Sequence, residues 1–284
     1  MVLSPKKILI TGATSGLGWA LAEEYAAKDI TLFLTGRNQE RLDQITKICQ
    51  DKKALVISQV IDIWDNQAFA QWINQVGNQF GLDLVIANAG ISAGTAQGLE
   101  SENQIKQIFA TNIDGVLNTI NPAIALMRDL AIQNQNNLKS QEKIYSKSIN
   151  GQIAIISSLA GFRGLPSSPA YSASKACVRV YGEALRGSLL DFGIAVSVVC
   201  PGYIKTPMTD VNNFPMPILI SANKAAQIIK KSLARNKSRI AFPVPLYFIV
   251  WLAALVSNVV VDPIFAKLPK KKSLDNCAIT NKKD

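Results

Sequence analysis

The 284-residue chain contains no histidine. This absence excludes histidine-based catalytic triads, imidazole metal ligands and histidine proton shuttles, so tyrosine, lysine and carboxylates must carry any proton chemistry. Cysteine is also scarce, and Cys49, Cys177, Cys200 and Cys277 show no C-x-x-C spacing. Neither a zinc site nor a disulfide framework is indicated. We therefore expect no bound metal and a reducing compartment.

The chain also lacks a segment typical of a signal peptide, because 1–7 is too short and an apolar strand pattern follows at once. A net charge of +10 would suit a nucleic acid or an anionic membrane as partner. However, no stripe of basic residues interleaved with aromatic residues occurs, and the basic residues concentrate in the last fifth of the chain. We expect a cytoplasmic protein that does not bind nucleic acid.

Apolar runs of strand length alternate with helical patterns along most of the chain. The predicted strands are 6–11, 30–35, 54–61, 82–87, 152–157, 194–200 and 239–242. The predicted helices between them are 19–28, 39–51, 65–80, 101–130, 170–191 and 222–235. This alternation predicts an α/β fold, a Rossmann-type doubly wound parallel sheet with helices on both faces and ligands at the carboxyl ends of the strands. We assign 1–243 to one domain, with the polar stretch 131–150 as an exposed insertion.

A glycine-rich turn, Thr11-Gly-Ala-Thr-Ser-Gly-Leu-Gly18, joins the first predicted strand to the first predicted helix. At such a junction, glycines let backbone N–H groups approach a pyrophosphate, and the helix N-terminus adds positive charge. By itself the turn could equally be a tight connection. Its place at the first strand–helix junction favours a dinucleotide site.

The second predicted strand ends at Gly36-Arg37. In a dinucleotide-binding fold an acid at this point selects NAD, whereas an arginine can hold the 2′-phosphate of NADP. We therefore expect NADP rather than NAD. The alternative is that Arg37 is only a solvated residue at the start of the next helix.

One stretch, 158–175, offers a hydroxyl, a phenol and an ammonium at Ser158, Tyr171 and Lys175. Tyr171 and Lys175 are four residues apart and would share one face of a helix. A neighbouring positive charge favours the phenolate, which would suit Tyr171 for acid–base catalysis. Such a pair often occurs by chance on a helix surface, so it indicates function only beside a cofactor site. Downstream, the apolar stretch 208–220 is either a substrate lid or a surface that faces a partner.

These motifs, in this order, resemble the short-chain dehydrogenase/reductase family and its single-domain branch, over about 6–242. They are Thr11-Gly12-x-x-x-Gly16-x-Gly18, Asn88-Ala-Gly90, Asn112, Ser158, Tyr171-x-x-x-Lys175 and Pro201-Gly202 with Thr206. The resemblance implies an NAD(P) cofactor and hydride transfer between nicotinamide and the carbon of a carbonyl or alcohol. It also implies a homodimer or homotetramer.

The resemblance further implies a catalytic set. Tyr171 would protonate the carbonyl oxygen during reduction, and Ser158 would hydrogen-bond the same oxygen. Lys175 would lower the pKa of Tyr171 and bind the nicotinamide ribose, and Asn112 would hold a water that links Lys175 to solvent. From its apolar neighbours alone, Asn112 could equally be a satisfied polar group of the core.

The implied cofactor contacts divide by the part of the dinucleotide they face. They are Gly12, Ser15, Gly16, Leu17 and Gly18 at the pyrophosphate, Asp62 and Ile63 at adenine, Asn88 and Gly90 at the ribose, and Ile204 and Thr206 at the carboxamide, with Arg37, Pro201, Gly202, Tyr171 and Lys175 completing the set. Two departures from the family pattern stand out: Ala87 precedes Asn88 where asparagine is often doubled, and Ser15 occupies a position that is basic in some NADP-dependent members.

The carboxy-terminal part, 244–284, combines an apolar run with a basic tail. A helix over 246–261 would be about 24 Å long, too short for a hydrocarbon core of about 30 Å. Peripheral membrane contact through 244–272, with Lys267, Lys270, Lys271 and Lys272 on anionic head groups, is one interpretation. Packing on the substrate pocket or on another subunit is equally compatible.

The leading hypothesis is thus an NADP-dependent oxidoreductase for a hydrophobic or lipid-like carbonyl or alcohol. The alternative is a non-catalytic NADP-binding regulatory protein or a membrane-tethered scaffold. A pure binder would have no need of Asn112, Ser158, Tyr171 and Lys175 together.

Overall fold

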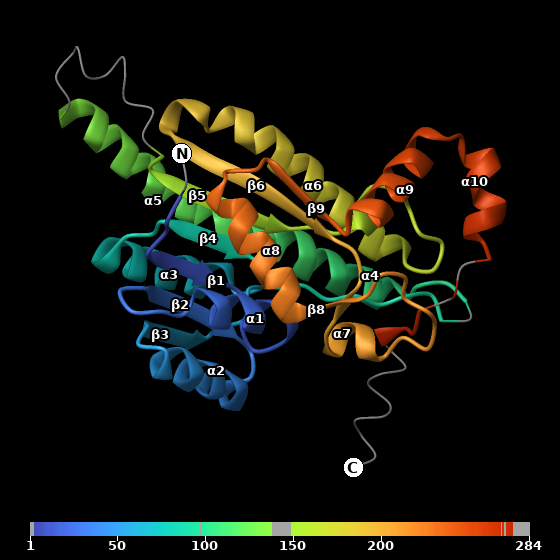
Figure 1. Cartoon of the computed structure of the whole chain (residues 1–284), viewed down its shortest axis with the longest axis horizontal. Helices are drawn as coiled ribbons and strands as arrows, with labels where there is room; N and C mark the ends of the chain where they lie inside the picture. The colour runs from blue at the N-terminus through green and yellow to red at the C-terminus, as the bar shows by residue number, and fades with distance from the viewer. Residues whose placement is uncertain (1–2, 97, 138–148, 268, 270, 275–284) are drawn as a thin grey trace.

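A computed structural model describes residues 3–96, 98–137, 149–267, 269 and 271–274. Its centre is a seven-stranded sheet in which every neighbouring pair is parallel, in the order β3-β2-β1-β4-β5-β6-β9 (Figure 1). The strands are β1 (Lys7–Ile10), β2 (Thr31–Gly36), β3 (Leu55–Val60), β4 (Leu84–Ala87), β5 (Gly151–Ile156), β6 (Ile194–Pro201) and β9 (Arg239–Phe242). The predicted doubly wound parallel sheet is confirmed.

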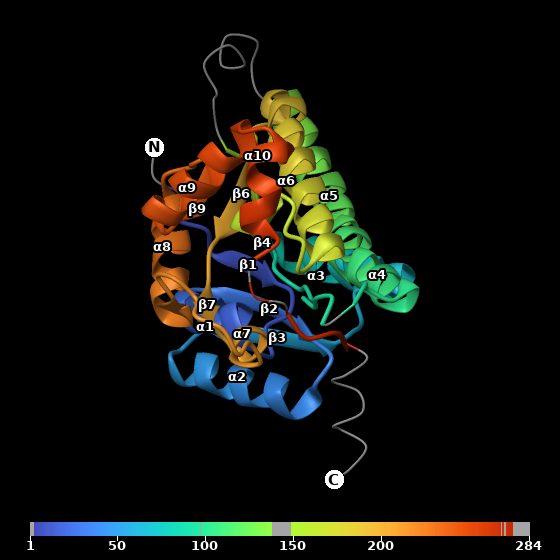
Figure 2. The same ribbon diagram turned by 90° about the vertical axis from the view of Figure 1, so that its right-hand side faces the viewer.

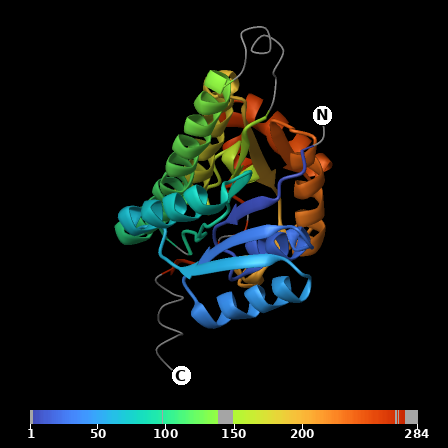
Figure 3. The same ribbon diagram turned by 90° about the vertical axis from the view of Figure 1, so that its left-hand side faces the viewer.

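Helices cover both faces of the sheet (Figures 2 and 3). One layer contains α1 (Gly16–Tyr25), α2 (Gln39–Asp51) and α8 (Ala222–Ala234). The other contains α3 (Asn66–Phe80), α5 (Gly115–Asn137) and α6 (Pro169–Ser188). Because side chains alternate along a strand, Ile8 and Ile10 of β1 pack in the first layer and Leu9 packs in the second. All three are fully buried, which explains why the strands are continuous apolar runs.

The order of the strands creates the site. From β1 the chain builds outward through β2 to β3, then returns to β4 on the other side of β1 and continues through β5 to β6. Such a reversal leaves a crevice at the carboxyl ends of the two central strands, where ligands bind in open α/β sheets. The loops after β1, β4, β5 and β6 all open into this crevice.

Several predicted boundaries are corrected. The helix predicted over 101–130 is α4 (Glu102–Phe109), a π-helical turn (Ala110–Asp114) and α5. The stretch predicted as an exposed insertion, 131–150, is wrong in its first part, because α5 continues to Asn137 and Ala131 is fully buried. Residues 138–148 lie outside the described residues.

Smaller elements complete the carboxyl edge. They are the two-stranded pair β7 (Ile204–Lys205) and β8 (Ile220–Ser221), and the short helix α7 (Pro207–Asp210). The side chain of Ser221 caps α8 by accepting a hydrogen bond from the backbone N–H of Lys224.

The apolar run near the carboxyl end is not one helix. It forms α9 (Val244–Leu255) and α10 (Asn258–Phe265), separated by Val256 in an extended conformation (ψ 142°) and by Ser257 at the N-cap position of α10. The predicted helix over 246–261 is therefore wrong, because the two polar residues that interrupt the run start a new helix. Among the residues described, no helix has the length and apolar character needed to cross a membrane.

Candidate active site

The turn after β1 forms a narrow cradle at the start of α1. Gly12 and Gly16 adopt φ values of +67° and +55°, which favour glycine. A Cβ atom on Gly18 would lie 2.2 Å from the carbonyl oxygen of Gly12, so this position has no room for a side chain. Ser15 stands at the N-cap of α1 without a side-chain capping bond, and it lines the cavity. The backbone N–H groups at the N-terminus of α1, a helix of ten residues, thus face the cavity, where they could bind a phosphate.

Thr11 and Asn88 tie this cradle to the end of β4. The hydroxyl of Thr11 accepts hydrogen bonds from the backbone N–H groups of Asn88 and Ala89, both at 3.0 Å. The side-chain amide of Asn88 donates to the carbonyl of Thr11 at 2.8 Å. These bonds hold the two loops of the crevice at a fixed separation.

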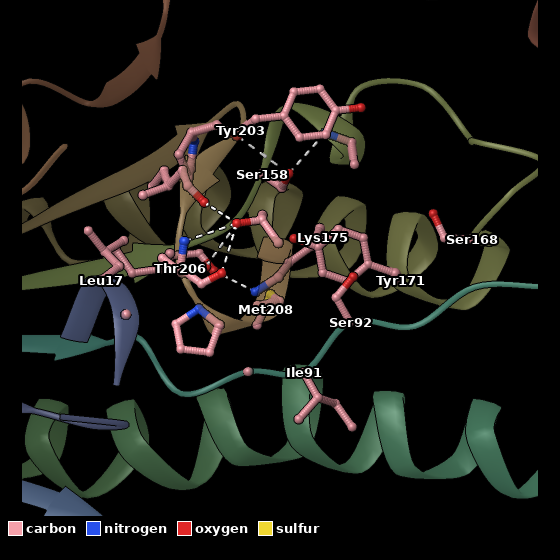
Figure 4. Close-up of a pocket in the computed structure, with 18 of the residues that line it drawn as sticks. Leu17, Ile91, Ser92, Ser158, Ser168, Tyr171, Lys175, Tyr203, Thr206 and Met208 are labelled. Carbon is pink, nitrogen blue, oxygen red and sulfur yellow. Dashed lines mark hydrogen bonds between the residues drawn. The ribbon is translucent and has the colours of Figure 1, made fainter. Parts of the chain in front are cut away.

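The loops enclose one cavity of about 790 Å³ (Figure 4). The predicted residues that line it are Gly12, Ser15, Gly16, Leu17, Arg37, Asp62, Ile63, Asn88, Gly90, Ser158, Tyr171, Lys175, Pro201, Gly202, Ile204 and Thr206. Gly18 and Asn112, which were also predicted, are not among the lining residues. Residues from the ends of six strands, β1 to β6, and from α6 are therefore brought together around a single space.

Ser158, Tyr171 and Lys175 lie in the same part of the cavity (Figure 4). The side chain of Ser158 is close enough to the phenol of Tyr171 to lower its pKa, while the hydroxyl of Ser158 donates to the carbonyl of Pro201 at 3.4 Å. The neighbouring Ser157 points elsewhere, since its hydroxyl donates to the carbonyl of Lys175 at 2.7 Å. Of the two serines, Ser158 is therefore the one whose hydroxyl can hydrogen-bond an oxygen atom that also contacts the phenol of Tyr171.

Burial dominates the electrostatics of the phenol. Desolvation raises the pKa of Tyr171, the side chain of Ser158 opposes this, and the nearby Tyr203 adds a smaller increase. Lys175 lies 5.9 Å from the centre of the Tyr171 ring, and its ammonium donates to the carbonyl of Ile156 at 2.8 Å. The pKa of Tyr171 is thus raised by burial, whereas a lowered pKa was expected, and Lys175 is not among the groups that shift it.

The ammonium of Lys175 is itself perturbed. Its side chain is almost completely buried, and desolvation lowers its pKa from about 10.5 to about 8, with a small opposing effect from Cys200. Lys175 can thus exchange a proton near neutral pH more readily than an exposed lysine.

Asn112 lies behind the cavity, in the π-helical turn. Its amide is completely buried and is bonded to protein groups, the backbone N–H and carbonyl of Ile91 at 2.9 Å and the hydroxyl of Ser174 at 3.0 Å. A Cβ atom on Gly90 would meet both the amide oxygen of Asn112 and the ammonium of Lys175. Asn112 therefore fixes the loop after β4 against α6, and its predicted role in holding a water remains a prediction.

Charged residues mark the opposite end of the cavity. Arg37 and Asp62 form an ion pair at 3.9 Å, with 65% and 39% of their side-chain areas exposed. An exposed pair at this distance contributes little free energy, so the guanidinium can take another anion. Arg41, in the first turn of α2 and four residues after Arg37, lines the same end, although it was not predicted as a site residue. Its place in the first turn of the predicted helix 39–51, close to Arg37 in the sequence, was the signal that could have revealed it.

The wall beside Tyr171 is mostly apolar and comes from segments distant in sequence. The stretch 207–217 contributes Met208 and Phe214, α9 contributes Leu246 and Ile249, and α10 contributes Phe265. Packing of 244–261 on the cavity, one of the three interpretations of this segment beside contact with lipid or with another subunit, thus agrees with the structure. No pattern in the sequence indicates which residues of these segments face the cavity.

A glycine cradle at the first strand–helix junction, with a tyrosine, a lysine and a serine at the same sheet edge, defines a Rossmann-type oxidoreductase site. The family model described as "short chain dehydrogenase" matches residues 6–215. The chain belongs to this family and is an NAD(P)-dependent enzyme that acts on CH–OH groups, which confirms the resemblance found in its sequence.

Two curated relatives illustrate the relationship. The chain is 30% identical over 267 residues to an uncharacterized oxidoreductase of Myxococcus xanthus, an alignment that covers 94% of this chain and 98% of the relative. It is 32% identical over 211 residues to a 3-ketodihydrosphingosine reductase of Bacteroides thetaiotaomicron, covering 74% of this chain and 68% of the relative.

Solved structures show the same fold. A short-chain dehydrogenase from Sphingobium yanoikuyae in complex with NADPH has a TM-score of 0.73 at 19% identity, covering 95% of this chain and 99% of the other. A short-chain dehydrogenase from Mycobacterium paratuberculosis bound to NAD has a TM-score of 0.69 at 20% identity, covering 83% and 95%. Both cofactors thus occur among proteins of this fold.

The lowered pKa of Lys175 predicts a stability that depends on pH. Between about pH 8 and pH 10, the unfolded chain holds a proton on this amine that the folded chain has lost. The free energy of unfolding due to this group should therefore rise by about 1.4 kcal/mol per pH unit in that window and stay constant below it. Urea denaturation of the wild type and of Lys175→Met across pH 6 to 10 measures the difference. A difference that does not change with pH would show that the amine titrates as an ordinary lysine.

Proposed function

We propose that the protein is an NADP-dependent oxidoreductase for a hydrophobic, lipid-like carbonyl or alcohol, with Tyr171 as its acid–base residue. The observation that carries this proposal is that Tyr171 and Ser158 line the same cavity as the glycine cradle, with Ser158 close enough to the phenol to lower its pKa. A proton donor and a place for a dinucleotide are thus adjacent.

The residues divide the work of the reaction between them. The bound cofactor supplies or accepts the hydride. In the reducing direction, the phenol of Tyr171 gives its proton to the carbonyl oxygen, and the raised pKa keeps that proton on the phenol until the oxygen becomes basic. Ser158 donates a hydrogen bond to the same oxygen and stabilises the charge that develops there. Lys175 binds the nicotinamide ribose and replaces the proton on Tyr171.

NADP is proposed over NAD from the charges at the adenosine end. Arg37 and Arg41 both line the cavity, as Gly36 does. The carboxylate in this region belongs to Asp62 and forms an ion pair with Arg37. A Cβ atom on Gly36 would lie 2.3 Å from the methyl group of Thr14, so an acidic side chain does not fit here without movement. Two guanidinium groups suit a 2′-phosphate better than a free hydroxyl.

A hydrophobic substrate is proposed from the wall of the cavity. Leu246 and Ile249 of α9, with Phe265 of α10, present aliphatic and aromatic surface next to the reactive end. A relative named a 3-ketodihydrosphingosine reductase supports a lipid ketone as the substrate class. The stretch 208–220 is proposed as the lid over this space, because Met208 and Phe214 line it.

Peripheral contact with a membrane is proposed for the outer face of α9 and α10. Phe248, Leu252 and Leu255 are each about half exposed or more, as are Val259 and Val260 in the next helix. Apolar side chains gathered in this way favour an interface rather than water. Self-association through α5 and α6, where Leu130 and Val180 are exposed, is proposed separately, and light scattering would measure it.

The rival proposal is a protein that binds NADP without catalysis. Tyr171→Phe separates the two: it removes only the reactive hydroxyl, so an enzyme should lose about a hundredfold to ten-thousandfold in kcat while NADPH binding is retained. Turnover of a medium-chain ketone and the fluorescence of bound NADPH are the measurements. Tyr181→Phe, on the exposed face of the same helix, is the matched control and should change neither. Full activity of Tyr171→Phe would reject the proposed role.

Cofactor choice has its own test. Arg37→Ala removes a charge-assisted contact to the 2′-phosphate and should raise the KM for NADPH about tenfold or more, with the KM for NADH nearly unchanged. Arg235→Ala, an exposed arginine at the end of α8, serves as the control. Equal effects on both cofactors, or a wild type that prefers NADH, would contradict the NADP proposal.

Membrane contact is tested by flotation with vesicles. Replacing Phe248, Leu252 and Leu255 with serine removes apolar surface from one face of α9, and we expect the bound fraction to fall severalfold on vesicles that contain phosphatidylserine. Serine at Leu99 and Leu190, two apolar residues exposed elsewhere, is the control. A wild type that does not float would reject the contact altogether.

A further inference from the structure

A short segment near the carboxyl end, Lys271–Leu274, crosses the mouth of the cavity, and we call it the strap. In Figures 1 and 2 this red segment passes between α7 and α4. It runs beside the loop that follows β4: the backbone N–H of Gly94 donates to the carbonyl of Lys272, and that of Ala96 donates to the carbonyl of Lys271, both at 2.8 Å. The strap is therefore held in place by backbone hydrogen bonds as well as by side chains.

Two further contacts anchor the strap. Gln104 of α4 is completely buried, and its amide oxygen accepts hydrogen bonds from the hydroxyl of Ser273 and the backbone N–H of Leu274, both at 2.8 Å. Leu274 packs against the small apolar cluster formed by Ala93, Ile108 and Ala170. A buried amide that is satisfied by the strap indicates a built contact.

The strap directs one charged side chain into the cavity. The ammonium of Lys271 donates to the hydroxyl of Ser92 at 2.7 Å and lies 5.8 Å from the centre of the Tyr171 ring. Lys271 and Ser92 both line the cavity, as Tyr171 does. The expectation that Lys271 contacts lipid head groups is therefore wrong, since its side chain faces the reactive end. Lys270 lies outside the described residues.

We propose that Lys271, with Ser92, binds a carboxylate of the substrate and selects oxo acids over neutral ketones. This inference rests on the proposed function and adds the chemistry of the substrate's polar end. The apolar chain of the substrate lies along α9 and α10, its carbonyl lies at Tyr171 and Ser158, and its carboxylate lies at Lys271. The substrate is then an amphiphile whose two polar groups are a few bonds apart.

Charge and position support this assignment. The described residues that line the reactive end include two ammonium groups, those of Lys175 and Lys271. In a partly buried cavity, a cation attracts a carboxylate more strongly than in water and disfavours a ligand that carries an amine. Lys175 donates to the carbonyl of Ile156, and Lys271 donates to the hydroxyl of Ser92. Lys271 comes from a segment placed across the cavity mouth, where the polar end of a substrate would enter or remain.

The test compares Lys271→Met with a matched variant on the adjacent residue, Lys272→Met, whose side chain is exposed. The substrates are linear oxo acids with different spacings between ketone and carboxylate, and their methyl esters. Loss of the charge-assisted contact should lower kcat/KM for the best acid about tenfold or more and leave the ester within about twofold. Lys271→Arg should keep most of the preference for the acid, and Lys272→Met should behave as the wild type.

The outcomes separate this inference from the proposed function. If the wild type reduces the esters but prefers no acid, or if Lys271→Met lowers the rates for acids and esters equally, Lys271 is only part of the wall and the inference fails. If no ketone is reduced with NADPH or NADH, the proposed function fails. Calorimetry with the same oxo acids then still decides the inference: it is upheld if Lys271→Met weakens binding about tenfold or more, and it is overturned if the affinity does not change.

Discussion

The site depends on how closely the turn after β1 approaches the end of β4. A Cβ atom on Gly18 would lie 2.5 Å from the side-chain amide of Asn88, and that amide is bonded to the carbonyl of Thr11. Glycine at position 18 lets α1 start directly beneath this bond. The N-terminus of α1 then faces the same crevice as Ser158, which follows β5, and Thr206, which follows β7. Without that approach, the cradle and the reactive side chains would belong to separate spaces.

Burial gives the reactive end its chemical character. Desolvation moves the pKa of Tyr171 upward and that of Lys175 downward, so both groups favour their neutral forms. A neutral phenol is a proton donor, and the side chain of Ser158 partly offsets the cost of forming its anion. A second cation, Lys271 of the strap, lies 5.8 Å from the centre of the same ring.

Most of the fold and much of the site follow from short-range patterns in the sequence. Strands buried on both faces must be apolar runs, and the motif residues fall where those runs end, which is why Gly12, Asn88 and Ser158 could be assigned in advance. Sequence patterns could not predict contacts between distant segments. Lys271 donates to Ser92, which is 179 positions away, and no periodicity in the sequence indicates this contact. The patterns also failed at 131–137, where a polar composition hid a helix that is held by the buried Ala131.

The central claim is that this cavity brings a nicotinamide ring and a carbonyl carbon together beside Tyr171. Transfer of deuterium tests it most directly. NADPH that carries deuterium on the reactive carbon of its nicotinamide is incubated with the protein and a ketone substrate, and the alcohol is analysed by mass spectrometry. The account predicts one deuterium on the carbinol carbon from one face of the cofactor. An alcohol without deuterium from either face, or no alcohol at all across the substrate series, would contradict it.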